Sequence, residues 1–188
     1  MANDAVGAWL DAAGRVPLLS PAQEISLGNT IRAWMDDPDP SAAVRRRGLR
    51  ARDRMVAANL QLVVTIAKKY VAAGERAGLG FKDLLQIGAL GLVRGCELFD
   101  PSKGYKLSTF AYWWIRQGIT RAVASGGVIK IPTNATDQLR HLQPGDLEGI
   151  SDRERARLTA AAAAPKVVSL DAPAGDGESA TLLDLIAG

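Results

Sequence analysis

The stretch Tyr105–Ala124, with the sequence YKLSTFAYWWIRQGITRAVA, contains two of the four tryptophans in this chain of 188 residues. Its apolar spacing predicts a helix, with about 100° between successive residues. Small and aliphatic side chains gather on one side of that helix: Ala111, Ile115, Gly118, Ile119 and Ala122. Aromatic and polar side chains gather on the other side: Phe110, Trp113, Trp114, Gln117, Thr120 and Arg121. The aliphatic side is therefore the predicted core face, and the aromatic side needs a separate explanation.

Two explanations of the aromatic side remain open. In the first, a neighbouring helix covers both tryptophans. In the second, the rings stack on unpaired bases, an interaction that contributes about 1–3 kcal/mol per base. Gln117 and Thr120 could then contact base edges. The cations that could bind phosphates are Lys103, Lys106, Arg116 and Arg121.

The segment before this stretch, FKDLLQIGALGLVRGCELF (81–99), predicts a second helix that is rich in glycine. Gly88, Gly91 and Gly95 each cost about 1 kcal/mol relative to alanine in a helix interior. Because the three glycines share one side, we expect a close crossing with another helix there, not a ligand-binding loop. The sequence DPSKG (100–104) predicts a turn between the two helices.

Further helices are predicted on both flanks of this pair, and the predicted fold class is all-α. Upstream, a short helix is expected over residues 4–18, and a second begins at a Ser20 cap followed by Pro21. A loop is expected over 36–43 and one continuous helix over 55–74. Downstream, helices are expected over 136–143 and 151–164, before an acidic loop at 171–180. No alternating strand pattern stands out in the sequence.

An arginine-rich segment, RRRGLRARDR (45–54), lies between the predicted loop and the helix that starts at Met55. It is either a solvated basic face or a surface that faces phosphates. The whole chain has a net charge of +3 and a pI of about 9.2. This balance permits a nucleic-acid partner without requiring one.

The composition excludes several kinds of site. One cysteine and one histidine leave no internal disulfide and no His/Cys zinc site. The sequence has no GxxxxGK[ST] phosphate loop, and no nucleophile stands in a known motif with the histidine. We therefore expect no enzyme activity, no catalytic residue, no cofactor and no metal. The acidic start is unlike a secretory signal, no apolar run reaches the roughly 20 residues of a membrane span, and the expected location is the cytoplasm.

Three stretches together resemble the central region of bacterial RNA polymerase sigma factors of the sigma-70 family. They are ANLQLVVTIAKKY (58–70), FKDLLQIGALGLVRGCELFDPSKGYKLSTFAYWWIRQGITRAV (81–123) and IKIP (129–132). Residues 4–31 resemble the segment that precedes this region in primary-like members of the cyanobacterial type. Residues 167–186 resemble the acidic linker called the sigma finger. The resemblance covers most of the chain.

The resemblance implies a helical sigma domain 2 core with a short helical extension and an acidic linker. The implied segments are 1–35, an N-terminal helical segment; 36–54, a variable loop and basic segment; 55–131, the domain 2 core; 132–165, a shortened domain-3-like helical segment; and 166–188, the finger-like linker. Nothing in the chain resembles the fourth domain, a helix-turn-helix that recognises the minus-thirty-five element. The chain is accordingly expected to be either a piece of a longer sigma factor or a minimal one.

The resemblance also implies a polymerase-binding turn. Asp83, Leu84, Leu85 and Gln86 match the residues that grip the clamp coiled coil of the largest polymerase subunit. From the polar residues that flank the two leucines, we expect all four on one exposed turn.

The implied DNA contacts lie mainly on the Tyr105–Ala124 stretch. Phe110 matches a ring that stacks on the flipped minus-eleven adenine, and Asn59 matches a residue beside that pocket. Trp113 and Trp114 match a wedge pair at the upstream fork of the melted bubble. Gln117 and Thr120 match the residues that recognise the minus-twelve pair. The further expected contacts are Lys103, Tyr105, Lys106, Ser108, Thr109, Arg116, Arg121 and Lys130.

Phe110 stands where tyrosine is usual and so keeps the ring without the hydroxyl, and four further positions depart from the family pattern. Ile87 stands where glutamate is usual and Ala89 where asparagine is common, both on the polymerase-binding helix. Asn134 and Asp137 replace the histidine and glutamate that contact an extended minus-ten motif. The first two changes are expected to affect polymerase affinity or partner choice. The last two are expected to affect the extended minus-ten contact.

The implied function is that of a sigma factor, which binds core RNA polymerase and directs minus-ten recognition, DNA melting and transcription initiation. The rival function is a polymerase-binding decoy or regulator, derived from a sigma factor, that opens no promoter. A repressor of double-stranded DNA is a third hypothesis, which the aromatic face disfavours. An anti-sigma factor is a further possible partner, and no membrane partner is expected.

Overall fold

A computed structural model of the chain describes residues 2–126, 151–163, 168–174 and 181–186. The chain divides into two compact units, Met1–Gly126 and Gly127–Gly188. The predicted helix at 136–143, Lys130, Asn134 and Asp137 lie outside the described residues.

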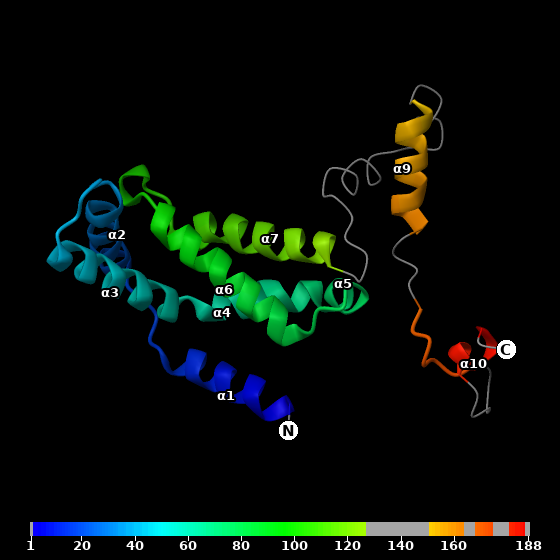
Figure 1. Cartoon of the computed structure of the whole chain (residues 1–188). Helices are drawn as coiled ribbons and strands as arrows, with labels where there is room; N and C mark the ends of the chain where they lie inside the picture. Colours follow the sequence, from blue (N-terminus) through cyan, green and yellow to red (C-terminus); the bar gives the residue numbers. More distant parts are fainter. Residues whose placement is uncertain (1, 127–150, 164–167, 175–180, 187–188) are drawn as a thin grey trace. The chain divides into compact units, whose positions relative to one another are not determined.

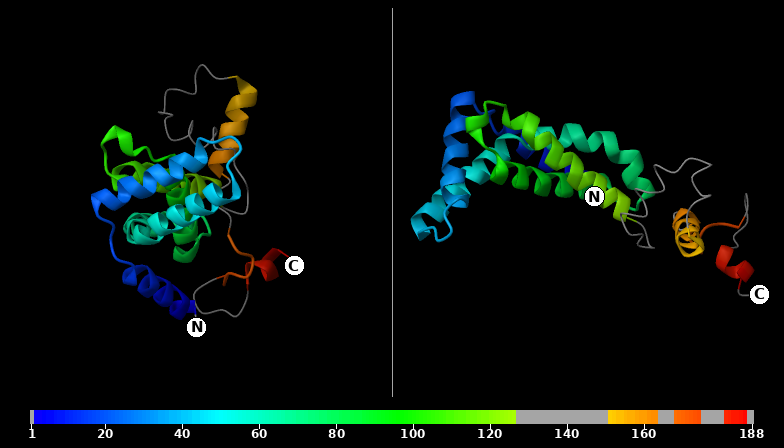
Figure 2. Two further views of the ribbon diagram at one scale, coloured as in Figure 1. Left: turned by 90° about the vertical axis from the view of Figure 1, so that its left-hand side faces the viewer. Right: turned by 90° about the horizontal axis from the view of Figure 1, so that it is seen from above.

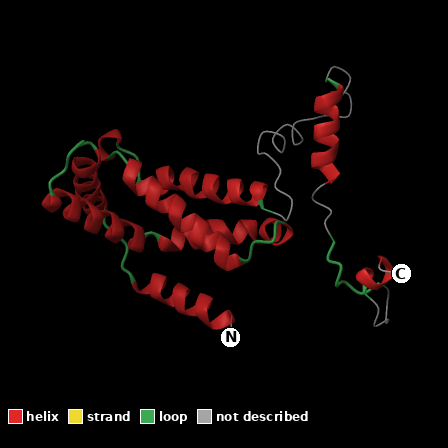
Figure 3. Cartoon of the chain, viewed as in Figure 1, coloured by secondary structure: helices red, strands yellow, loops and turns green. Residues whose placement is uncertain are grey.

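The described residues form helices joined by short loops (Figures 1 and 3). The first unit contains α1 (Ala2–Arg15), α2 (Pro21–Met35), α3 (Ala42–Ala58), α4 (Leu60–Ala67), η1 (Lys68–Tyr70), α5 (Val71–Arg76), α6 (Phe81–Leu98), η2 (Pro101–Lys103) and α7 (Leu107–Ser125). The second contains α9 (Asp152–Ala163) and α10 (Leu182–Ile186). In these ranges there is no strand, only an isolated bridge between Pro173 and Thr181. The predicted all-α class is confirmed, whereas the short α10 was not predicted.

The start of α2 follows its sequence signal. The backbone N–H of Gln23 donates to Ser20 Oγ at 3.3 Å, and the backbone N–H of Ser20 donates to Gln23 Oε1 at 2.9 Å. Two N–H groups that the helix itself cannot satisfy are thereby paired in a capping box. Pro21 occupies the first turn, where its missing N–H is harmless.

The segment from 42 to 76 differs from the prediction in two ways. Helix α3 begins at Ala42, after a Ser41 cap, so the arginine-rich segment is helical and continuous with Met55. The single helix expected over 55–74 is instead broken at Asn59 and again at η1. At Asn59 the side-chain Nδ2 donates to the Met55 carbonyl at 2.8 Å, while the backbone N–H donates to Val56. The amide side chain takes the acceptor that the helix would have used, so the helix ends there.

Helix α6 lies at the centre of the first unit, where it packs on α2, α3, α4 and α7. The views in Figures 1 and 2 show α6 and α7 running side by side. Fully buried core side chains come from five helices: Ile31, Met55, Val63, Ile66, Leu84, Leu92, Ile115 and Ile119. This core holds α7 against α6 along its length.

The close crossing predicted from the glycines is confirmed between α6 and α7. A Cβ on Gly91 would lie 2.7 Å from the Trp114 carbonyl oxygen and 2.9 Å from the Ile115 Cα. A Cβ on Gly95 would lie 3.2 Å from the Ala111 Cα, and one on Gly88 would lie 2.6 Å from a methyl carbon of Val63. The backbones approach so closely that only glycine fits at position 91.

The turn between α6 and α7 reverses the chain within a few residues. Asp100 Oδ1 accepts from the backbone N–H of Ser102 at 3.0 Å and from its hydroxyl at 2.7 Å. Gly104 follows with a φ of +75°, in the left-handed region that glycine adopts at low cost. The turn brings Phe99, the residue after α6, close to Tyr105 before α7.

Candidate nucleic-acid interface

Helix α7 has the two faces that its sequence predicts. Leu107, Ala111, Ile115 and Ile119 are completely buried against the core, while Gly118 and Ala122 are half-buried. On the other side, Trp113, Arg116, Gln117 and Arg121 are exposed, and Thr120 is half-buried. An exposed polar and aromatic surface is therefore carried by a helix whose opposite face is fixed.

The two tryptophans have different surroundings. Trp113 is 61% exposed, with the guanidinium of Arg116 at 5.4 Å from its ring centre. The ring of Tyr112 is nearly perpendicular to that of Trp113, with 5.7 Å between the two ring centroids. Trp114 is half-buried and packs on Phe110, with 6.3 Å between ring centroids. The explanation by a covering neighbour fits Trp114 in part, and it does not fit Trp113.

Phe110 lies inside a cluster of aromatic rings. The ring of Tyr105 is stacked on it at 5.9 Å and 18°, and Phe99 lies at 6.2 Å. Phe99 is buried beneath the cluster, while Tyr105 is 38% exposed. Tyr105 covers one side of Phe110, so a base could reach only what remains exposed of the two rings. Phe99 was not among the predicted site residues; the tight DPSKG turn after it is the signal that could have placed it there.

The remaining predicted DNA contacts fall into three groups. Lys103, Lys106, Ser108 and Thr109 are exposed around the start of α7. Asn59 is half-buried between α3 and α4, where its amide N–H already donates to Met55. Lys130 lies outside the described residues. The turn and α7 thus supply one connected surface from Lys103 to Arg121.

The predicted polymerase-binding turn must be corrected. Leu84 and Leu85 are buried, and a Cβ on Gly74 would lie 2.9 Å from Leu84, so the expected exposure of all four residues on one turn is wrong for the two leucines. Asp83 and Gln86 are exposed. Asp83 Oδ2 accepts the Gly80 backbone N–H at 2.9 Å, which caps α6.

An exposed leucine extends this turn. Leu90 is 70% exposed and follows Gln86 by four residues, on the same face of α6. Helical spacing alone could have identified it. A small cavity adjoins the turn, lined by Val6 and Trp9 of α1 and by Lys82, Leu85 and Gln86 of α6.

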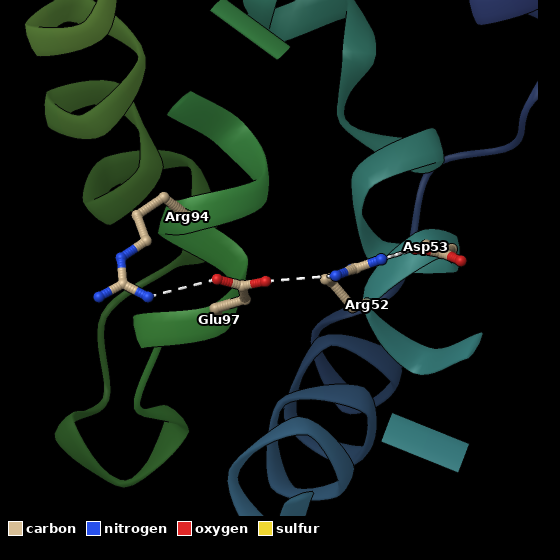
Figure 4. A network of polar contacts seen from close by, with 4 residues as sticks. All are labelled: Arg52, Asp53, Arg94 and Glu97. Atoms are coloured by element: carbon tan, nitrogen blue, oxygen red, sulfur yellow. Dashed lines mark hydrogen bonds and ion pairs between the residues drawn. The ribbon is translucent and has the colours of Figure 1, made fainter. Parts of the chain in front are cut away.

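A chain of ion pairs joins α3 to α6 (Figure 4). Glu97 accepts from Arg52 at 3.3 Å and from Arg94 at 3.4 Å, and Arg52 also contacts Asp53 at 2.8 Å. The guanidinium of Arg52 lies 5.9 Å from the ring centre of Trp34. Arg52 is therefore a structural residue, unlike the other arginines of α3.

Two further features concern chemistry. Burial raises the pKa of the Cys96 thiol to about 12, so the thiol is inert while the fold is intact. In the part of the chain that the structure describes, no three His, Cys, Asp or Glu residues come together as a metal site would require.

Among the described helices, none has the length and apolar composition needed to cross a membrane.

Comparison with known proteins identifies two matching families. Residues 55–127 match the family described as Sigma-70 region 2, and residues 4–37 match the one described as Sigma-70 factor, region 1.2. The first of these ranges includes α4, α6 and α7 entire, and the second includes α2 with most of α1.

Three of the similar curated proteins come from cyanobacteria. The chain is 40% identical over 150 residues to RNA polymerase sigma factor SigA4 of Synechococcus elongatus, covering 75% of this chain and 47% of that protein. It is 42% identical over 168 residues to RNA polymerase sigma-B factor of Nostoc sp., covering 74% and 49%. It is 36% identical over 228 residues to RNA polymerase sigma factor SigA2 of Synechococcus elongatus, covering 97% and 70%. The chain thus spans about half the length of the first two relatives.

Proposed function

The chain belongs to the sigma-70 family of RNA polymerase sigma factors, and from this membership we propose that it binds core RNA polymerase and directs recognition and melting of the promoter minus-ten element. The observation that carries the proposal is Trp113, which exposes 61% of its surface on a helix anchored by four buried residues. A large exposed aromatic ring on a rigid element is suited to stack on a base pair or an unpaired base.

The proposed mechanism uses the two sets of aromatic rings differently. Extruding one base from a duplex costs a few kcal/mol. Trp113 abuts the end of the duplex as a wedge, while Tyr105 and Phe110 offer ring surface to the displaced base. Arg116, stacked on Trp113, carries a positive charge at the fork. Because the core already orders α7, little conformational entropy is lost when the DNA binds.

In this proposal, recognition of the sequence is separate from wedging. Gln117 is exposed one turn beyond Trp113 and has the donor and acceptor that can bind a base edge, with Thr120 beside it. Lys103, Lys106, Ser108 and Thr109 bind the single strand at the other end of the surface. The exposed or half-buried position of each of these side chains supports the assignment.

Polymerase binding is proposed to use Asp83 and Gln86 together with Leu90. The two polar residues supply hydrogen bonds, and Leu90 supplies apolar area that would become buried in the complex. Weak contacts to DNA then combine with contacts to polymerase, since tethering raises the effective concentration of the second site. Catalysis belongs to the polymerase in the cytoplasm, so no catalytic residue, cofactor or metal is assigned to this chain.

The proposed segments keep the described helices whole except α3 (Ala42–Ala58), which crosses the proposed boundary between 36–54 and 55–131. Residues 1–35 contain α1 and α2, residues 55–131 contain the proposed promoter and polymerase contacts, and α9 lies in the proposed domain-3-like segment, 132–165. Lys130 remains a proposed DNA contact, and binding of an anti-sigma factor remains a prediction.

A decoy that binds polymerase without opening DNA is the second candidate. Ile87, at a position where the family resemblance implies glutamate, is half-buried and leans toward α7: its Cγ2 lies 3.8 Å from where a Cβ on Gly118 would be. That position offers a partner no carboxylate. The loss of one polar contact favours altered polymerase binding.

One experiment tests both candidates. Core polymerase is mixed with the full chain on a duplex promoter carrying a minus-ten element, and unpaired thymines are detected with permanganate. A sigma factor makes the minus-ten thymines reactive only when the chain is present. Co-purification with polymerase but no reactive thymines would establish the decoy instead, and failure of the chain to bind polymerase would refute both.

A further inference from the structure

The most basic element of the first unit is α3, not the proposed DNA-contacting helix α7. Residues 1–126 contain 17 Lys and Arg against 11 Asp and Glu, a net charge of +6, while residues 127–188 carry a net charge of −3. Helix α3 alone holds six arginines and one aspartate. Helix α7 holds two arginines. The excess positive charge of the unit is therefore concentrated on α3.

Most of this charge has no partner among the residues that the structure describes. Arg52 is paired with Asp53 and Glu97, as Figure 4 shows. The other five are exposed and make no side-chain hydrogen bond or ion pair with any described residue: Arg45, Arg46, Arg47, Arg50 and Arg54. Four of them, Arg46, Arg47, Arg50 and Arg54, share a face that spans roughly 100° of the helix; this set is the arginine face.

The orientation of the arginine face is fixed by packing on another side of α3. Gly48, Ala51, Met55 and Ala58 are buried. A Cβ on Gly48 would lie 2.5 Å from the Cβ of Trp34 in α2. The helix cannot rotate without breaking this contact, so the arginines stay in solvent.

We propose that the arginine face of α3 binds the phosphate backbone of double-stranded DNA, independently of base sequence. A guanidinium donates two parallel hydrogen bonds to phosphate, and all six basic residues of α3 are arginine. Arg46 and Arg54 are eight residues apart, which is about 12 Å along the helix. That length corresponds to three or four phosphates of one strand, at about 3.4 Å each along the duplex axis.

Two observations favour duplex DNA over other anionic partners. The exposed large apolar side chains of the described residues include none on α3, whereas a protein interface usually has an aromatic or apolar centre. Helix α3 also contains no aromatic residue on which an unpaired base could stack. A charged surface without apolar or aromatic anchors fits a duplex backbone.

The test measures how salt weakens binding of the full chain to DNA, without polymerase. The probe is a fluorescent 30-base-pair duplex that lacks any minus-ten-like sequence, titrated by anisotropy between about 0.05 and 0.2 M salt. The variant R46Q/R50Q/R54Q should make the slope of log K against log salt shallower by about 2–3. Its affinity at 0.1 M salt should fall at least tenfold. Glutamine keeps the helix propensity close to that of arginine.

Two matched variants decide whether position or total charge matters. K68Q/K69Q/R76Q removes three exposed charges from η1 and α5 and should change the slope by less than about 1. R46K/R50K/R54K keeps the charges and should keep the slope. Equal slopes for the parent and R46Q/R50Q/R54Q would overturn the proposal, as would equal losses in both glutamine variants. Tighter binding of polyglutamate than of duplex at the same ionic strength would assign the face to an acidic protein instead.

The outcome is independent of the proposed function. The probe carries no promoter element and the assay contains no polymerase, so a failure here leaves promoter opening by α7 untouched. Conversely, a chain that opens no promoter can still show the predicted salt slope.

Discussion

Trp113 and Trp114 are adjacent in the sequence, yet the fold gives the two rings different surroundings. Trp113→Ala removes an exposed ring and should change the free energy of unfolding by no more than about 0.5 kcal/mol. Trp114→Ala removes a ring packed on Phe110 and should cost about 1–3 kcal/mol, below the range for fully buried aromatics. Urea unfolding followed by circular dichroism measures both changes.

The same pair separates stability from promoter opening. With polymerase, Trp113→Ala should cost about 1–3 kcal/mol in opening a duplex and much less on a template already melted at the minus-ten element. Permanganate reactivity on the two templates gives the comparison. If Trp113→Ala unfolds the chain, or opens the duplex as the parent does, the exposed ring is not the wedge.

Gln86 and Leu90 allow polymerase binding to be tested without damage to the core. Gln86→Ala with Leu90→Ala removes two exposed side chains and should weaken binding to core polymerase at least tenfold, with the melting temperature almost unchanged. Asp83 is left in place because its carboxylate caps α6. Leu18→Ala with Gln61→Ala, also exposed, is the matched control and should bind as the parent does. Equal binding by both double variants would rule out this face of α6.

Asp100 shows how the turn before α7 responds to acid. The Ser102 hydroxyl and backbone N–H donate to its carboxylate and lower the pKa of Asp100 below the usual value. A group with a lowered pKa contributes stability above its unfolded pKa and loses that contribution as the pH falls through its folded pKa. Ser102→Ala removes the hydroxyl donor and should raise the pKa of Asp100 part of the way back to its usual value. The return is only partial because the backbone N–H donor remains. Carbon-13 NMR titration of the carboxyl would detect the shift; an unchanged pKa would remove the hydroxyl as its cause.

The crossing of α6 and α7 is the element on which the candidate interface depends. Gly91→Ala places a methyl group against the backbone of Trp114 and Ile115, so it should destabilise the protein by about 1–3 kcal/mol or more and tilt α7. Gly7→Ala, in α1, meets nothing within 4 Å and should be neutral or stabilising by up to about 1 kcal/mol. Thermal unfolding of the two variants gives the comparison. A Gly91→Ala protein as stable as the parent would show that the two backbones can separate at little cost.

The helices that could be predicted from sequence are those with local signals. The Ser20 cap, the glycines of α6 and the two-sided pattern of α7 each depend on neighbours within one or two turns. The break at Asn59 depends on one side-chain hydrogen bond to Met55, which competes with an otherwise good helix pattern. The burial of Leu84 and Leu85 depends on other helices, because α6 is apolar on several sides. In the same way, contacts with other parts of the fold decide that Trp113 is exposed while Trp114 is half-buried.

The charges of the whole molecule are divided unequally, +6 on residues 1–126 and −3 on the rest. The acidic C-terminal part should reduce non-specific DNA binding at low salt, where electrostatic interactions reach about 30 Å. Neutralising Asp171, Asp176, Glu178 and Asp184 with Asn or Gln should raise the affinity for a random duplex a few-fold at about 0.01 M salt and much less at 0.15 M. This affinity is measured by the anisotropy of the fluorescent duplex during titration with the full chain. An affinity that does not change at low salt would show that these acids act on neither the DNA nor the basic unit.

Cys96 has a consequence for the chemistry of oxidation. Cys96 is completely buried, and burial raises the pKa of its thiol to about 12, so a folded molecule at pH 7 presents almost no reactive thiolate. While α6 stays in the core, almost no thiolate is therefore available to attack peroxide or glutathione disulfide. We therefore expect that, in the presence of an oxidant, covalent dimers and mixed disulfides form mainly from unfolded molecules, so that oxidation of Cys96 would report on the folding of the protein.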